Sequence, residues 1–123
     1  MTTLLKLPFP PTTNNLFRNI TGGRTKTVRY RTWLNAAGWE LQAAKPASFP
    51  GRIALNIALG KPDNRRRDLS NYVKAIEDLL VKHEVIKDDS FVVALHVSWA
   101  DISGAIVEIR DMEISDELLK VPA

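Results

Sequence analysis

The clearest structural signal in the sequence is the stretch RIALNIAL at residues 52–59. Its apolar residues recur with a period of two, which places them on one face of a β-strand; they are Ile53, Leu55, Ile57 and Leu59. The segment GKPD at residues 60–63 ends this strand. The next segment is NRRRDLSN at residues 64–71, in which three arginines precede an aspartate. We therefore expect a buried strand that leads through an arginine-rich loop into a helix.

Two amphipathic helices flank this strand in the prediction. Residues 27–44 carry apolar side chains at three-to-four spacing, which indicates one buried face. Residues 68–82 repeat the pattern, with Asp68 as a plausible N-cap. The apolar positions of this second helix are Leu69, Tyr72, Val73, Ile76, Leu79 and Leu80. Its polar face carries Ser70, Asn71 and Lys74.

The remaining segments complete one small domain over residues 1–123. Residues 4–7, 91–99 and 105–110 read as strands, the last two joined by a turn as an antiparallel pair. Residues 12–26 are expected to form a basic, mobile loop, and residues 112–123 an acidic tail. The order β-α-β-α-β-β predicts an α+β fold with one mixed sheet and two main helices.

Charge is distributed unevenly along the chain. Residues 1–67 hold twelve Lys or Arg against two acids, and residues 68–123 hold five against twelve. The two parts carry net charges of +10 and −7, an asymmetry that favours nucleic-acid binding. A solvated surface on which charge happens to segregate is the alternative.

Composition excludes several kinds of site. There is no cysteine, so disulfides and cysteine-ligated zinc are excluded. The sequence contains no glycine-rich phosphate loop, and we expect no nucleotide cofactor. Apolar runs are shorter than a membrane span, and the first residues lack a secretory apolar region. We therefore expect a cytoplasmic protein with no membrane partner.

Asp68 and the pair Asp88 and Asp89 are the candidate metal ligands. Mg²⁺ takes carboxylate, water and phosphate oxygens, polarises a scissile phosphate and lowers the pKa of a bound water. Asp68 precedes the second helix and the acidic pair follows it, so the return loop must fold back for these acids to meet. Spacing alone favours the alternative, in which Asp68 is a simple N-cap and the pair forms a turn.

Basic residues near these acids are candidates for phosphate contacts. Lys74, on the polar helix face, can stabilise negative charge on a phosphate, although a solvated surface lysine is the simpler interpretation. Arg65, Arg66 and Arg67 are suited to bidentate phosphate binding and precede a helix N-terminus, which favours anions. The alternative for this triplet is a solvated loop.

Aromatic residues allow a second kind of contact. Phe9 and Phe17 lie beside the basic loop and are candidates for base stacking or for core packing. For Trp33 and Trp39 we favour a place in the core or in an interface.

Taken together, these residues resemble the RusA family of Holliday-junction resolvases. The similarity is carried by LPFPPTTNN at residues 7–15, PDNRRRDLSN at residues 62–71 with Lys74, and VIKDDS at residues 85–90. The resemblance implies a homodimeric endonuclease that cuts two opposed strands of a four-way DNA junction with Mg²⁺ or Mn²⁺. Such enzymes are typical of bacteria, phages and prophages.

The resemblance also implies roles for particular residues. Asp68 and Asp89 would be catalytic metal ligands, Asp88 a further ligand, and Lys74 a catalytic cation. From the charge of the arginine triplet and of the basic loop, and not from the resemblance, we expect DNA to be held by Arg65, Arg66, Arg67, Arg18, Arg24 and Lys26, with Asn71 as a further candidate. The chain departs from the family pattern Asp-Leu-Asp-Asn at Ser70, which supplies no negative charge. We expect weaker metal binding, a transfer of the missing role to Asp88 or Asn71, or reduced activity.

Three functions therefore follow from the sequence. The first is a Mg²⁺-dependent endonuclease that resolves Holliday junctions in recombination and repair. The second is a junction-binding protein that lost cleavage with its middle acid, and the third, weaker interpretation is an RNA-binding α+β domain.

Overall fold

The alternating stretch forms strand β4 (Ile53–Leu59) inside a four-stranded sheet of the computed structural model, which describes residues 1–112. The strand order is β1-β6-β4-β5. Strands β1 (Thr2–Leu7) and β4 both pair antiparallel with β6 (Ala105–Asp111), whereas β5 (Val92–Trp99) pairs parallel with β4. The predicted mixed sheet and α+β class are confirmed.

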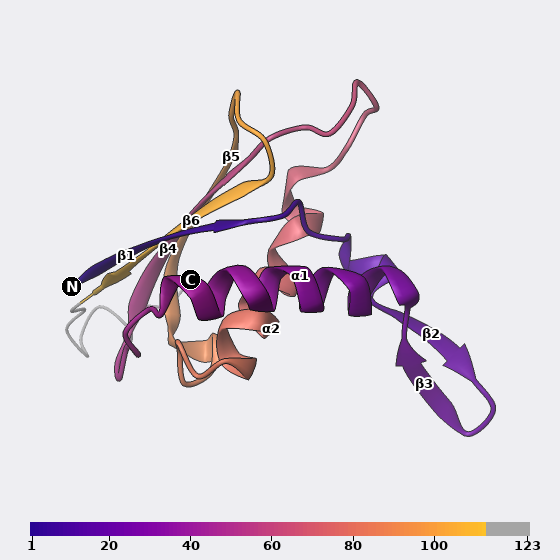
Figure 1. Ribbon diagram of the computed structural model, residues 1–123, viewed down its shortest axis with the longest axis horizontal. Coiled ribbons are helices and arrows are strands. Elements are labelled where there is room, and N and C mark those ends of the chain that lie inside the picture. The colour runs from indigo at the N-terminus through magenta and orange to yellow at the C-terminus, as the bar shows by residue number, and fades with distance from the viewer. Residues whose placement is uncertain (113–123) are drawn as a thin grey trace, which may run out of the picture.

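Both helices pack on the same side of this sheet (Figure 1). Helix α1 (Val28–Ala44) begins after Thr27, whose side chain accepts a hydrogen bond from the Tyr30 N–H, and ends at Lys45 in the left-handed region. The predicted second helix is divided into a 3₁₀ turn, η2 (Leu69–Tyr72), and helix α2 (Val73–Lys82). Two further 3₁₀ turns are η1 (Thr13–Asn15) and η3 (Asp89–Phe91).

Apolar side chains of the helices and the inner sheet face form one core. It includes the predicted stripe of β4 and, from the helices, Leu34, Leu41, Ile76, Leu79 and Leu80. Trp33 is buried and its Nε1 donates a hydrogen bond to the Pro8 carbonyl at 3.0 Å, as a core residue should. Trp39 lies outside the core, because 75% of it is exposed on α1.

The expected pairing of the last two strands is wrong. β6 lies between β1 and β4, and the segment that joins β5 to β6 crosses the end of β4. This arrangement gives β6 two hydrogen-bonded neighbours and buries Ala105, Val107 and Ile109 completely. If β6 instead formed a hairpin with β5, it would lie at the edge of the sheet and have only one hydrogen-bonded neighbour.

Gly60 permits this crossing, because a Cβ at Gly60 would lie 1.7 Å from the Ile102 carbonyl oxygen. We expect Gly60→Ala to lower the free energy of unfolding by about 1–3 kcal/mol or more, since backbone must move to relieve the overlap. Gly51→Ala is the matched control, because nothing lies within 4 Å of its added Cβ. Chemical denaturation measures both variants, and equal stabilities would contradict this account of the crossing.

The segment expected as a loop over residues 12–26 contains η1 and a β-hairpin of β2 (Phe17–Ile20) and β3 (Gly23–Lys26). Gly22 occupies the hairpin turn with a φ of 84°, a left-handed conformation that glycine adopts without strain. The hairpin projects away from the sheet and helices (Figure 1). Among the described residues, its two strands form a separate two-stranded sheet.

Two sequence expectations concern other parts of the chain. Residues 113–123 of the expected acidic tail lie outside the described residues. Of the helices within residues 1–112, none combines the length and the apolar character needed to cross a membrane.

Candidate active site

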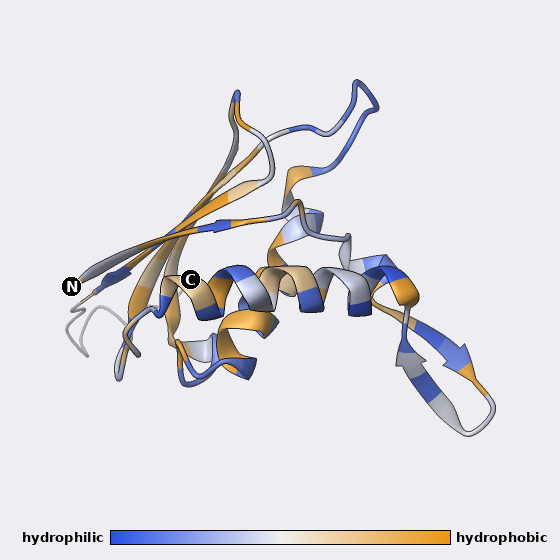
Figure 2. Cartoon of the chain, in the orientation of Figure 1, coloured by the Kyte–Doolittle hydropathy of each residue, from blue (hydrophilic) through white to orange (hydrophobic). Residues whose placement is uncertain are grey.

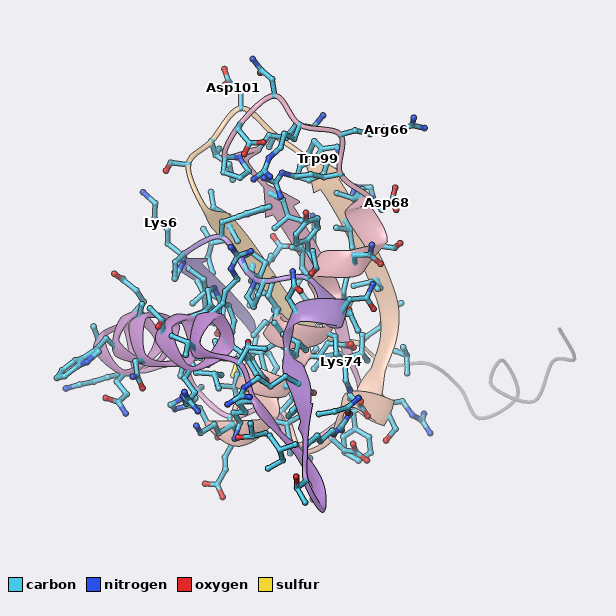
Figure 3. All side chains as sticks on the ribbon, turned by 90° about the vertical axis from the view of Figure 1, so that its right-hand side faces the viewer. Lys6, Arg66, Asp68, Lys74, Trp99 and Asp101 are labelled. Atoms are coloured by element: carbon cyan, nitrogen blue, oxygen red, sulfur yellow. The ribbon has the colours of Figure 1, made fainter. Side chains whose placement is uncertain are left out.

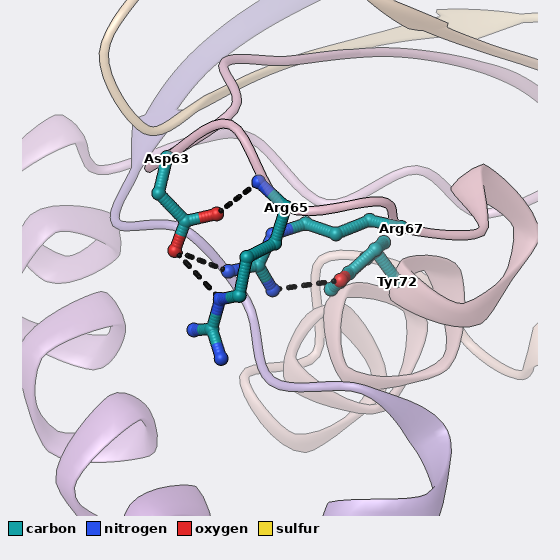
Figure 4. Close-up of polar contacts among 4 residues, drawn as sticks. All are labelled: Asp63, Arg65, Arg67 and Tyr72. Carbon is teal, nitrogen blue, oxygen red and sulfur yellow. Dashed lines mark hydrogen bonds and ion pairs between the residues drawn. The ribbon is translucent and has the colours of Figure 1, made fainter.

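The hydrophilic loop between β4 and η2 (Figure 2) is organised by one carboxylate, that of Asp63. Its Oδ1 accepts a hydrogen bond from the Arg65 backbone N–H at 3.0 Å. Its Oδ2 accepts from Arg65 Nε at 3.1 Å and from Arg67 Nη2 at 2.8 Å (Figure 4). Arg67 Nη1 also donates to the Tyr72 hydroxyl at 3.2 Å, which ties the loop to η2. The arginine triplet is therefore divided, because Arg66 projects into solvent instead (Figure 3).

Arg67 is the least exposed arginine of the triplet. Its side chain is 18% exposed, against 78% for Arg65, and its guanidinium carbon lies 5.8 Å from the centroid of the Phe9 ring. Its Nε is buried without a hydrogen-bond partner among the described residues. Contacts with Asp63, Tyr72 and Phe9 therefore hold the side chain of the residue immediately before Asp68.

The pKa of Asp63 provides a test of this network. The hydrogen bond from the Arg65 N–H, followed by that from the Arg67 side chain, lowers it from 3.8 to about 2. A pKa that folding lowers stabilises the loop above about pH 4, and the effect is lost as the pH falls through about 2. We expect the Asp63 carboxyl ¹³C resonance to titrate near pH 2, and nearer its ordinary value in Arg67→Ala. Identical midpoints in the two proteins would contradict the network.

Asp68 occupies the N-cap position of η2, but its side chain makes no capping hydrogen bond. Its backbone carbonyl accepts from the Asn71 N–H at 3.1 Å. The N-cap interpretation therefore accounts for the backbone of Asp68 and leaves its carboxylate unassigned. Asp68 and Ser70 line a groove of about 630 Å³, whose apolar wall includes Leu95 and Trp99.

Asn71, expected to contact DNA, is half-buried at the residue after Ser70. Its backbone carbonyl accepts a hydrogen bond from Thr13 Oγ1 at 3.2 Å, which joins η2 to η1.

Lys74 contacts one of the expected ligands directly. Its Nζ lies 3.2 Å from Asp78 Oδ1 and 3.3 Å from Asp89 Oδ2. These hydrogen bonds, the one to Asp78 first, raise the pKa of Lys74, so its ammonium stays charged at neutral pH. Burial raises the pKa of Glu77, and the charge of Asp89 raises it further. Lys74 is thus part of an acidic cluster and is not an isolated surface lysine.

Asp88 and Asp89 open the turn that precedes β5. Asp88 Oδ2 accepts a hydrogen bond from Ser90 Oγ at 3.0 Å, and this bond, with those from Asp89, lowers the pKa of Asp88. This arrangement fits the turn that spacing suggested.

The expected acids lie in two places, Asp68 at the start of η2 and Asp88 and Asp89 at the start of η3. Asp89 contacts Lys74, which follows Asp68 by six residues, or about 10 Å of helix. Figure 3 shows Asp68 and Lys74 at separate heights along this part of the chain. Within residues 1–112, no three His, Cys, Asp or Glu side chains form a group able to hold a metal. A single copy of the described chain therefore brings Asp89 to Lys74 and leaves Asp68 in its own groove.

Sequence reasoning did not assign a role to Asp63 or Asp78. The spacing of Lys74 and Asp78, four residues apart on one helix, was a usable signal for their ion pair. Asp63 two residues before Arg65 matches an aspartate that bonds the backbone of its own turn.

The hairpin carries Arg18, Arg24 and Lys26 and no acidic residue. The Arg24 guanidinium carbon lies 4.1 Å from the centroid of the Phe17 ring, which packs edge-on against Tyr30 at 5.8 Å. The contact of Phe17 with Tyr30 attaches the base of the hairpin to α1, while the turn of the hairpin is exposed. Phe17 is therefore used for packing.

Comparison with known proteins gives a consistent result over most of the chain. The family model described as Endodeoxyribonuclease RusA matches residues 8–110, which include the hairpin, the arginine loop and the expected acids. A relative named crossover junction endodeoxyribonuclease RusA, from Aquifex aeolicus (strain VF5), is 34% identical over 115 residues. That alignment covers 89% of this chain and 90% of the relative.

Two further relatives with the same protein name extend the comparison. The one from Escherichia coli (strain K12) is 29% identical over 115 residues, and the one from Enterobacteria phage 82 is 28% identical over 123 residues. Each alignment covers 92% of this chain and 96% of the relative. Because the family model spans residues 8–110 and these relatives align over nearly their whole length, the chain belongs to the RusA endodeoxyribonuclease family.

Proposed function

We propose that this chain is a structure-selective DNA endonuclease that resolves Holliday junctions in recombination and repair. The observation that carries the proposal is the unassigned carboxylate of Asp68, which follows the arginine loop directly and opens onto a groove. Membership of the family supports the substrate, because the relatives are named as crossover junction enzymes. The phage relative supports a phage or prophage origin, and the cytoplasm is the proposed place of action.

The chemistry of the donor atoms suits Mg²⁺ or Mn²⁺. Asp68, Asp89 and Asp88 are exposed carboxylates, the oxygen ligands that such ions prefer. When bound, the ion would polarise the scissile phosphate and activate a water. Ser70 offers a hydroxyl in the groove of Asp68, which is suited to holding a water by hydrogen bonding.

Lys74 would act on the phosphate. Its charged Nζ is held by Asp78 and Asp89, and a preoriented cation stabilises negative charge that develops on phosphate oxygens. Asp78 fixes the position of Lys74 on the helix and is a positioning residue in this proposal.

The proposal includes a homodimer. β5 is an edge strand of the sheet, and Leu95 on it is 50% exposed at the apolar wall of the Asp68 groove. An apolar groove on an open sheet edge is suited to a second copy, and a two-fold dimer matches the paired incision of a two-fold symmetric junction. Light scattering in solution should give the mass of two chains. The mass of a single chain at the concentration used for the cleavage assay would contradict the homodimer.

The basic hairpin should contribute a salt-dependent part of junction affinity. We expect the triple variant Arg18→Ala, Arg24→Ala, Lys26→Ala to reduce the slope of log affinity against log salt by about 0.9 for each phosphate that the hairpin no longer neutralises. The matched control removes three exposed lysines elsewhere, Lys6, Lys45 and Lys82. Equal slopes for the two triple variants would show that the hairpin does not bind the DNA backbone.

Incubation with a labelled mobile four-way junction tests the function as a whole. With Mg²⁺ or Mn²⁺, and not with EDTA, the protein should convert the junction into two nicked duplexes by paired cuts in opposed strands. Tight junction binding without cleavage in either metal would instead identify a binding protein that lost cutting with the change to Ser70. Preference for structured RNA over the DNA junction would overturn both.

A further inference from the structure

A second concavity shares one lining residue, Arg67, with the Asp68 groove. It measures about 340 Å³, within the roughly 300–1,000 Å³ of small-molecule sites. Its walls come from the segment Phe9–Thr12, the first turns of α1 and the arginine loop. Arg67 lines both this pocket and the groove, so an occupant of the pocket would lie beside the candidate active site.

The apolar part of the pocket is aromatic. The rings of Phe9 and Tyr72 lie with their centroids 4.9 Å apart at an angle of 31°, and Trp33 and three prolines complete the wall. The polar atoms of these rings are already used, because Trp33 Nε1 donates to Pro8 and the Tyr72 hydroxyl accepts from Arg67. Such a wall is suited to a flat ring that binds by stacking.

The charged part of the pocket favours an anion. Arg29, Arg65 and Arg67 line it together with Asp63, so its walls carry a net charge of +2. Arg65 and Arg67 share the carboxylate of Asp63, whereas Arg29 is exposed on the first turn of α1. A free phosphate would leave the aromatic wall unfilled, and an apolar molecule would desolvate the arginines without pairing them. A flat ring joined to a phosphate satisfies both parts.

We propose that this pocket binds one unstacked nucleotide of the DNA strand beside the cut, with its base on the aromatic wall and its phosphate on Arg29. The proposal rests on the proposed endonuclease function and adds a recognition site to it. Taking a base out of a stack costs least where the stack is already interrupted. The pocket would therefore favour a branch point over continuous duplex and make Arg29 a specificity-determining residue.

A double-mutant cycle between DNA and protein tests the site. In EDTA, binding is measured for junctions that carry an abasic residue at each position next to the crossover in turn. At one position, loss of the base should weaken binding to the wild-type protein roughly ten-fold. Thr12→Trp, which places a ring in the pocket, should remove this effect, and Thr32→Trp on the exposed face of α1 should not.

Arg29→Ala provides a second readout that does not depend on filling the pocket. It should weaken junction binding more than Arg31→Ala, which removes the same charge two residues further along α1, outside the pocket. An abasic scan with no sensitive position, or equal affinities for the two arginine variants, would overturn the pocket. Cleavage of the intact junction by the same preparations would then show that the proposed function stands without it, whereas absence of both binding and cleavage would remove both proposals.

Discussion

Asp68→Asn is expected to slow cleavage of a four-way junction at least about 100-fold, the scale on which loss of one preorganised electrostatic group slows an enzyme. Junction affinity should stay within about a factor of two, because the substitution keeps the shape of the side chain and the arginine loop. The physical reason is the unassigned carboxylate, since folding uses the backbone of Asp68 and no capping bond uses its oxygens. Single-turnover cleavage with Mg²⁺, and binding in EDTA, separate the two effects.

Asp101→Asn is the matched control, because Asp101 is an exposed aspartate in the turn between β5 and β6 (Figure 3). It removes the same charge without touching the groove and should cut at the wild-type rate. An Asp68→Asn protein that cuts as fast as this control would exclude Asp68 as a ligand. If neither the wild type nor the variant cuts while both bind, the chain is a junction-binding protein.

The helices and strands that could be predicted from the sequence are those that bury one face and expose the other. Helix α1 and strand β4 show their periods clearly because each packs a single face on the core. The pairing of β5 and β6 could not be read in this way, since a short turn between two strands has the same local pattern whether or not they become neighbours. The outcome depends on β1 and β4, which flank β6 and lie far from it in sequence.

The β2–β3 hairpin shows a different limit. Apart from Phe17 at its base, it buries little, so it has no alternating apolar pattern that would predict strands. The two glycines at its turn were the available signal, and their positive φ values are compatible with a tight connection. Its basic charge was visible from composition, whereas its shape was not.

The candidate site was predictable to the extent that its residues lie on one continuous segment, from Asp68 through η2 into α2. Asp68 and Lys74 follow each other on η2 and α2, so local spacing places both on the same stretch. The partner of Lys74 was not predictable, because Asp89 arrives through a separate turn and only the packing of η3 beside α2 decides which acid it meets. The metal site could not be predicted from local spacing either, because its proposed ligands Asp68 and Asp89 lie apart within one chain.

Lys74→Gln is the second substitution for which we expect a large effect, a loss of about 100-fold in the rate of junction cleavage. Glutamine is one atom shorter than lysine but keeps a polar side chain with N–H donors, so the change removes mainly the positive charge. Junction affinity should change little, because Nζ is already paired with Asp78 and Asp89 and most of the basic charge lies elsewhere. Single-turnover rates at saturating protein measure the chemical step apart from binding.

Lys82→Gln is the matched control, since Lys82 is exposed in the last turn of the same helix. A structural role for Lys74 predicts a different result, because removing its charge leaves Asp78 facing Asp89 and would lower the melting temperature without a specific effect on cleavage. Loss of cleavage at unchanged melting temperature therefore assigns Lys74 to the reaction. Loss of both, restored together in the double variant Lys74→Gln, Asp78→Asn, would instead assign the Lys74 ion pairs to holding α2 against the turn that carries Asp89.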